Sequence, residues 1–203
     1  LRLVGSEMCI RDRAPAKLRE DPKLRRKMGG IWYADQAAAR FIRDMEVAFP
    51  DSLFIFTGDH SVGIFPYDCD LVPRREPTIR ETKLTSFAMS HPGLSPALFA
   101  GNTIGGHMNI LPTLIELIAP RGFVYESLFS SLLQPIDHVV TPYCWMTRDE
   151  IGIYQDRIAQ PLGTFAEMPP VALNTVRYEE ERAAWCELTG WLVRHPEFLE
   201  KTE

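Results

Sequence analysis

The pattern of apolar and polar residues predicts a helix that leads into a buried strand. Within residues 34–49, apolar residues recur every three or four positions, which is typical of an amphipathic helix. These positions are Ala34, Ala38, Phe41, Ile42, Met45 and Phe49. Residues 53–56 (LFIF) are wholly apolar, as expected of a buried parallel strand, and the run stops at TGDH, residues 57–60. A helix before a buried strand predicts an α/β fold.

A second helix is predicted to begin near Asn109, a good N-cap, with Pro112 tolerated in the first turn. Pro120 and Gly122 end it. Its apolar stripe consists of Leu111, Leu114, Ile115 and Ile118. A strand is predicted within residues 84–89, before this helix.

The remaining pattern predicts an irregular loop, an edge strand and a last helix. Residues 61–83 are rich in proline and charge, which is typical of a loop, and residues 136–140 predict an edge strand. Residues 177–195 predict the last helix, closed by Pro196. Its apolar side consists of Ala184, Leu188, Trp191 and Leu192.

Composition fits a globular protein: of 203 residues, 45% are apolar and 24% charged, with a net charge of −5. No apolar run approaches the roughly 18 residues of a membrane span. Residues 1–30 have a net charge of +5 (9 Lys and Arg against 4 Asp and Glu), and the rest has −10. The basic stretch at residues 11–27 has no interleaved aromatics, so a solvated helix face is favoured over a nucleic-acid or lipid contact.

The first residues, 1–13 (LRLVGSEMCIRDR), resemble translated sequencing-adapter read-through, and no initiating Met precedes them. We expect this segment to be a non-native artefact and the rest to be the C-terminal part of a longer protein. A natural disordered N-terminus is the alternative. Four cysteines without CxxC spacing argue against a zinc knuckle or a disulfide-rich miniprotein.

Asp59 and His60 are the strongest candidates for chemistry. A neighbouring carboxylate and imidazole after a buried strand can both reach one metal ion, and such oxygen and nitrogen ligands suit Zn²⁺ or Mn²⁺. The alternative is a capping aspartate beside a surface histidine.

Two segments carry a family resemblance: WYADQAAARFIRDMEVAFPDSLFIFTGDHS, and GGHMNILPTLIELIAP about fifty residues later. Together they resemble the C-terminal half of the alkaline phosphatase/sulfatase superfamily, closest to its lipoteichoic acid synthase-like, phosphoglycerol transferase branch. The resemblance covers about residues 29–133. It implies an α/β sandwich with a mostly parallel central sheet, of which this chain holds the C-terminal half.

The resemblance also implies that Asp59 and His60 are ligands of a divalent metal ion, with Mn, Zn, Ca or Mg as candidates. Further ligands and the Thr, Ser or Cys-derived nucleophile are expected upstream, so no catalytic residue is assigned here and this piece alone should be inactive. Asn109 stands where many members have Asp. The implied substrate is a phosphate or sulfate ester, with a lipid-linked ester among the alternatives. The resemblance implies action on the extracytoplasmic side of the cell membrane or in the periplasm, in a branch whose members often carry a membrane anchor.

Other residues have weaker claims. His107 is a candidate substrate contact, with a loop histidine bonded to backbone as the alternative, and the claim of His91 is weaker still. Asp68 and Asp70, beside Cys69, are expected on a solvated loop. Four residues are expected to be structural, the two cysteines as core packing: His138, His195, Cys144 and Cys186.

The predicted organisation is residues 14–143 as the C-terminal half of a catalytic domain and residues 144–203 as a variable tail with a terminal helix. The predicted function is that of a metal-dependent sulfatase-like hydrolase or phosphoglycerol transferase. A non-catalytic α/β binding module, or a degenerate enzyme, is the alternative.

Overall fold

The computed structural model describes residues 22–61, 63, 65, 75–99, 104–162, 170–174 and 176–198. The chain forms two compact units: Leu1–Pro77 with Leu84–Leu94, and Thr78–Lys83 with Ser95–Glu203. The expectations for residues 1–13 and for Asp68, Cys69 and Asp70 lie outside the described residues, as does most of the basic stretch at residues 11–27. The domain boundaries predicted after residues 13 and 143 stay predictions.

The helix of the first unit, α3, runs from Pro22 to Ala48. The helix predicted at residues 34–49 is therefore present, but it begins earlier than the apolar pattern indicated. Pro22 occupies the first helical position, where its missing N–H costs no helical hydrogen bond. Of the predicted apolar face, Ile42 and Met45 are half-buried, whereas Phe41 is 60% exposed. The packed face is narrower than the periodicity predicted.

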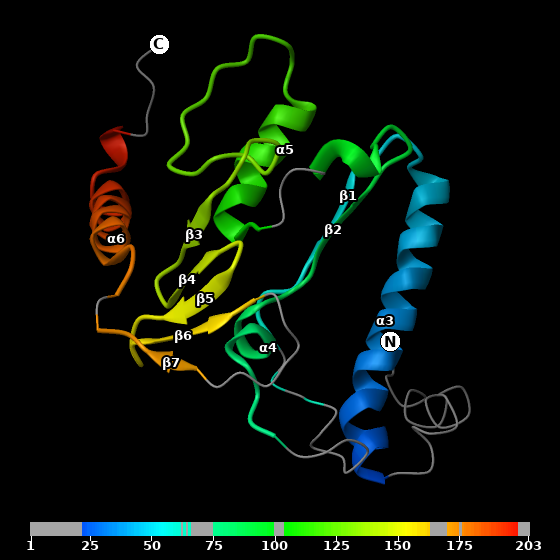
Figure 1. The fold of residues 1–203 in the computed structure, drawn as a ribbon. Helices are drawn as coiled ribbons and strands as arrows, with labels where there is room; N and C mark the ends of the chain where they lie inside the picture. The colour runs from blue at the N-terminus through cyan, green and yellow to red at the C-terminus, as the bar shows by residue number, and fades with distance from the viewer. Residues whose placement is uncertain are drawn as a thin grey trace. The chain divides into compact units, whose positions relative to one another are not determined.

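Two short strands complete the first unit, β1 (Phe54–Thr57) and β2 (Phe87–Ser90) (Figure 1). They pair antiparallel, with Phe54 opposite Ser90 and Thr57 opposite Phe87. The hydroxyl of Ser90 donates to Oε1 of Glu46 at 2.7 Å, which ties β2 to α3. Both strands overlap the runs predicted at residues 53–56 and 84–89, and each ends one residue later than predicted.

The prediction of a mostly parallel central sheet, and with it of an alkaline phosphatase-like sandwich, is wrong for the described residues. Their two sheets, one of two strands and one of five, are antiparallel throughout. A wholly apolar run such as LFIF indicates burial, but it does not encode the direction of the neighbouring strand. In β1 even the burial is partial, since the first three residues are half-buried and Thr57 is exposed.

The second unit is built on a five-stranded meander in which each strand pairs with the next along the chain (Figure 1). The strands are β3 (His138–Val140), β4 (Cys144–Thr147), β5 (Glu150–Ile153), β6 (Ile158–Pro161) and β7 (Val171–Ala172). The edge strand predicted at residues 136–140 is confirmed as β3. The other four strands were not predicted.

The core of this unit gathers around Trp145, which has no exposed surface. Val140, Tyr154, Ala159 and Val176 form the buried cluster with it. Trp145 lies opposite Gly152 in the register of β4 and β5. A Cβ on Gly152 would overlap the indole, so only glycine leaves room for this ring.

Helices and 3-10 turns surround the sheet: α4 (Ile79–Lys83), η2 (Pro96–Phe99), η3 (His107–Asn109), α5 (Ile110–Ile118), α6 (Glu179–Arg194) and η4 (Pro196–Phe198). Ile79 of α4 is 4% exposed, and its N–H donates to Oε1 of the buried Gln160 at 2.7 Å. The last helix is present as predicted, but none of its residues is buried, and Leu188 and Trp191 of its predicted apolar side are exposed.

Helix α5 confirms the helix predicted from Asn109 to Pro120, but with a different buried face. Leu111 and Ile118 are 65% and 68% exposed, whereas Pro112 and Thr113 are buried. The hydroxyl of Thr113 donates to the Asn109 carbonyl at 2.6 Å and accepts the N–H of Leu132 at 2.8 Å. A polar tether, rather than an apolar stripe, thus fixes the following loop to the helix.

We predict that Thr113→Val lowers the free energy of unfolding by about 1–3 kcal/mol, because it removes the hydroxyl to which the N–H of Leu132 donates. Thr189→Val is the matched control. The Thr189 hydroxyl also donates to the carbonyl four residues earlier, at 2.6 Å, but no described N–H donates to it. Urea unfolding of both variants tests this tether, and equal losses would contradict it.

Candidate metal-binding pair

The TGDH segment carries two polar side chains away from the end of β1. The N–H of Gly58 donates to the Ser86 carbonyl at 3.1 Å, which extends the pairing with the other strand beyond Thr57. The side chains of Asp59 and His60 follow, 87% and 75% exposed. The pair lies at the strand end as predicted. The strand does not belong to a parallel sheet, however, because it pairs antiparallel with β2.

Thr85, which lies just before β2, requires a glycine at position 58. A Cβ on Gly58 would overlap the hydroxyl of Thr85, and it would also meet the Cβ of Thr85 at 3.3 Å. The bare backbone therefore lets the two chain segments approach closely just before the candidate pair.

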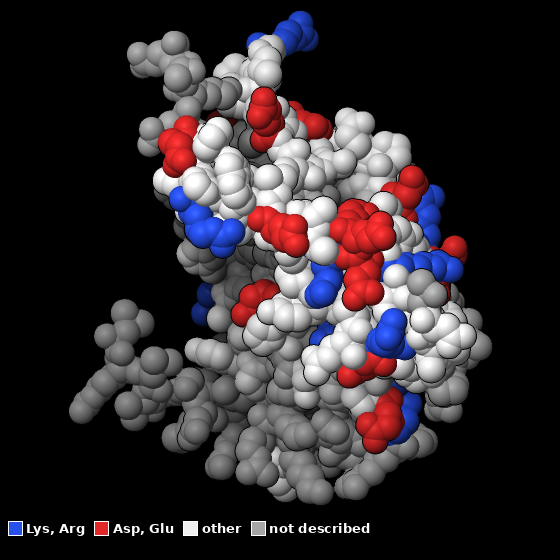
Figure 2. All heavy atoms as spheres, turned by 90° about the vertical axis from the view of Figure 1, so that its left-hand side faces the viewer, with Lys and Arg blue, Asp and Glu red and all other residues white. Residues whose placement is uncertain are grey.

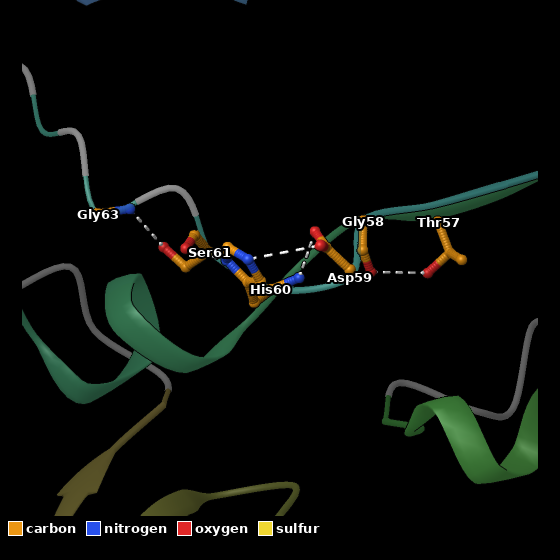
Figure 3. Close-up of polar contacts among 6 residues, drawn as sticks. All are labelled: Thr57, Gly58, Asp59, His60, Ser61 and Gly63. Atoms are coloured by element: carbon orange, nitrogen blue, oxygen red, sulfur yellow. Dashed lines mark hydrogen bonds and ion pairs between the residues drawn. The ribbon is translucent and has the colours of Figure 1, made fainter.

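Hydrogen bonds hold Asp59 and His60 facing each other (Figure 3). Oδ1 of Asp59 accepts the backbone N–H of His60 at 2.9 Å, and Oδ2 lies 3.4 Å from Nε2 of the ring. Nδ1 of His60 lies 2.8 Å from the carbonyl oxygen of Ser61. Since a carbonyl oxygen only accepts, Nδ1 carries a hydrogen. The contact between Nε2 and Oδ2 is an ion pair when Nε2 is protonated as well, and a bound metal ion would take the place of that proton.

This arrangement fits two neighbouring ligands of one metal ion. Ligands that each lie about 2.0–2.2 Å from a tetrahedral ion are roughly 3.3–3.6 Å apart, and Oδ2 and Nε2 are 3.4 Å apart. A backbone carbonyl that fixes the tautomer is the usual support of a metal-binding histidine. An oxygen and a nitrogen donor together suit Zn²⁺ or Mn²⁺ better than Mg²⁺ or Ca²⁺.

Two ligands are only part of a metal site. Among the residues that the structure describes, no group of three or more His, Cys, Asp and Glu side chains is placed to hold a metal ion. The remaining ligands of a complete site would have to come from other residues.

His107, the predicted substrate contact, is exposed and begins η3 in the second unit. Asn109 orders this turn: Oδ1 accepts the N–H of Gly106, and Nδ2 donates to the carbonyl of Ser130, both at 2.8 Å. Asn109 occupies the N-cap position of α5, as predicted, but its side chain forms no capping hydrogen bond there, and its oxygen reaches back to Gly106 instead. An aspartate here could not donate to Ser130, which explains the amide.

The other histidines make local contacts. Nδ1 of His91 accepts the N–H of Gly93 at 2.9 Å. Nε2 of His138 lies 2.8 Å from Oε2 of Glu181, and Nδ1 of His195 lies 3.0 Å from Oε1 of Glu197. The structural roles expected of His138 and His195 stay predictions.

The two cysteines of the described residues differ from each other. Cys144 is half-buried on β4, with its sulfur 3.3 Å from the hydroxyl of Thr141. Cys186 is exposed on α6, so its expected place in the core is wrong. Its neighbour Trp185 is half-buried, and consecutive positions of a helix face different directions.

The sequence did not point to Thr85 or Ser61, which lie outside the candidate pair. The Ser61 carbonyl bonds to the ring of His60, and Thr85 lies close to Gly58. Ser61 contributes a backbone carbonyl, which leaves no trace in the residue type, and Thr85 lies far along the chain from Gly58. The glycine inside TGDH was the available signal that a side chain lies close by.

Comparisons with known protein families, with curated proteins and with solved structures give no match to this chain. Within the part of the chain that the structure describes, no helix combines the length and the apolar character needed to cross a membrane.

We predict that Gly58→Ala lowers the free energy of unfolding by about 1–3 kcal/mol, because the added methyl group overlaps Thr85. Thr85→Ala should restore much of the loss in the double variant, since it removes the overlapping hydroxyl. Urea unfolding followed by circular dichroism measures both.

Gly30→Ala is the matched control, since nothing lies within 4 Å of a Cβ at this position of α3. It should raise stability by about 0.5–1 kcal/mol through helix propensity. If Gly58→Ala behaves like Gly30→Ala, the close approach of Thr85 is not a constraint.

Proposed function

We propose that the chain is part of a metal-dependent hydrolase or transferase that acts on phosphate or sulfate esters. The single observation that carries the proposal is the pairing of Oδ2 of Asp59 with Nε2 of His60 at 3.4 Å, with the imidazole fixed by the carbonyl of Ser61. The TGDH and PTL segments, in this order, favour the alkaline phosphatase/sulfatase superfamily. The proposal stands on these segments and on the donor geometry, not on the antiparallel sheets.

Asp59 and His60 would supply two ligands of a divalent cation. When bound, such a cation polarises the ester and stabilises the charge that develops on its oxygens. Asp59 accepts the His60 N–H, and this bond keeps the carboxylate turned toward the ring. His107 stays a candidate substrate contact, on a turn that Asn109 holds.

The nucleophile and the other metal ligands belong, in this proposal, to a longer gene product. The resemblance to the lipoteichoic acid synthase-like branch supports a lipid-linked ester as substrate and an extracytoplasmic or periplasmic location. It also supports membrane anchoring of the longer protein.

A second candidate function is a non-catalytic binding module. The observation that favours it is that the described residues offer a pair of donors rather than a group of three. In such a module Asp59 and His60 would be a solvated pair with no preference for a metal ion.

We predict that the full chain binds Zn²⁺ or Mn²⁺, and that Asp59→Ala and His60→Ala each weaken this binding by about tenfold or more. Isothermal titration calorimetry with each metal measures the change. His195→Ala is the control, because it removes an imidazole that pairs with Glu197 rather than with Asp59. Equal affinity in all variants would favour the binding module.

In a longer gene product that contains the nucleophile, Asp59→Ala should lower turnover of an aryl phosphate or aryl sulfate ester by about a hundredfold or more, because a metal contributes several kcal/mol to such reactions. Metal content, measured by elemental analysis, should fall with it. Unchanged metal content and unchanged turnover together would remove the pair from the mechanism.

A further inference from the structure

Helix α6 has an exposed apolar stripe beside the side that packs on the second unit. The packed side carries Arg182 and Trp185, which contact the β3–β4 turn and the loop that follows α5. Ala184, Leu188 and Trp191 form the outer stripe, because spacings of four and three residues bring side chains onto one line of a helix. Leu188 is 42% exposed and Trp191 38%, and the helix lies at the edge of the unit in Figure 1.

The outer stripe ends in a preformed aromatic cluster. The indole of Trp191 stacks on the imidazole of His195, with ring centroids 4.6 Å apart, and the ring of Phe198 lies 4.8 Å from the indole. Phe198 is 66% exposed. Rings that already hold one another lose little conformational entropy when a partner covers them, and tryptophan is enriched in the energetic centres of interfaces. The cluster is therefore suited to anchor a partner.

Charge is polarised along the same helix. The first turn carries Glu179, Glu180 and Glu181, and the last turn carries Arg194. Glu180, Glu187 and Arg194 are exposed and recur every seven residues, so they form one row beside the outer stripe. A second copy of α6 that lies antiparallel brings the acidic end of one row against the basic end of the other, and it also opposes the helix dipoles. Glu187 then meets its own counterpart, which limits the affinity.

The antiparallel arrangement also matches large side chains with small ones. When Glu180 lies opposite Arg194 of the second copy, the two-fold axis passes midway between these positions. Trp191 then reaches the exposed Ala184 of the other helix, and Leu188 lies beside the axis against its own counterpart. Such a surface is self-complementary, as a two-fold dimer requires.

We propose that two copies of the chain associate through the outer stripe of α6, with the two helices antiparallel. Charge complementarity between the two ends of the helix selects a second copy as the occupant. A helix of 16 residues is about 24 Å long, so this contact lies at the low end of specific interfaces, at about 1,200 Å² or less. We therefore expect a reversible dimer with a Kd of roughly micromolar order. The proposal is independent of Asp59 and His60.

Sedimentation equilibrium of the full chain, from about 1 to 300 μM, tests the dimer. Leu188→Glu places a charge beside the axis and should weaken association by about a hundredfold or more. Val193→Glu is the matched control, because Val193 is 76% exposed and lies on the other side of the same helix, so its Kd should equal that of the wild type. Circular dichroism checks that each variant keeps its helices.

Charge reversal tests the antiparallel register, and it carries the test if Leu188→Glu fails to fold. Glu180→Arg and Arg194→Glu each place like charges opposite one another at two symmetric positions, and each should weaken the dimer by about tenfold. The double variant restores both pairs with their signs exchanged and should recover the wild-type Kd. Since both substitutions oppose the helix dipole, a merely structural effect would add in the double variant rather than cancel.

Three results would overturn the proposal. The first is a wild type that stays monomeric over the whole concentration range, which would leave the outer stripe to another occupant. The second is a folded Leu188→Glu variant that associates as tightly as Val193→Glu. The third is a double charge-reversal variant that dimerises no more tightly than the single variants.

Discussion

The second unit depends on one packing contact, the indole of Trp145 against Gly152 across β4 and β5. The ring has no exposed surface, and a side chain at Gly152 would overlap it. Because Gly152 has no side chain, the Trp145 ring on the neighbouring strand can lie against it, and Val140 and Tyr154 pack with this ring in the buried cluster. Aromatic burial of this kind dominates the energetics of small cores. The α6 helix, which contributes no buried residue of its own, packs against the cluster that this contact creates.

The first unit uses a glycine in the same way at its candidate site. Gly58 leaves room for Thr85, and the chain then turns so that Asp59 and His60 face each other. In the second unit, charge is mixed on the surface: on the face shown in Figure 2, acidic and basic side chains of the described residues lie among one another rather than in a separate basic field.

Sequence patterns located several elements because those elements have strong local signals. The periodic segments became α3, α5 and α6, and the apolar run LFIF became β1. Strand direction could not be predicted, since it depends on a partner distant in the sequence. The meander was missed because its strands are short and buried at adjacent positions, as in EIGI, so they show no apolar–polar alternation. Asp59 and His60 were found because they are neighbours in the sequence. The carbonyl that fixes the imidazole belongs to the backbone of Ser61, so only the three-dimensional structure reveals it.

The ribbon that carries the candidate pair consists of two strands of four residues each. A ribbon of this size is marginally stable alone, so local unfolding exposes its amides to exchange far more often than global unfolding does. Gly58 pairs with Ser86 immediately before Asp59 and His60, so opening of the ribbon frees the segment that carries the pair. A ligand that needs the pair held at the end of the closed ribbon therefore binds with an apparent affinity that falls in proportion to the fraction of molecules in which the ribbon is closed.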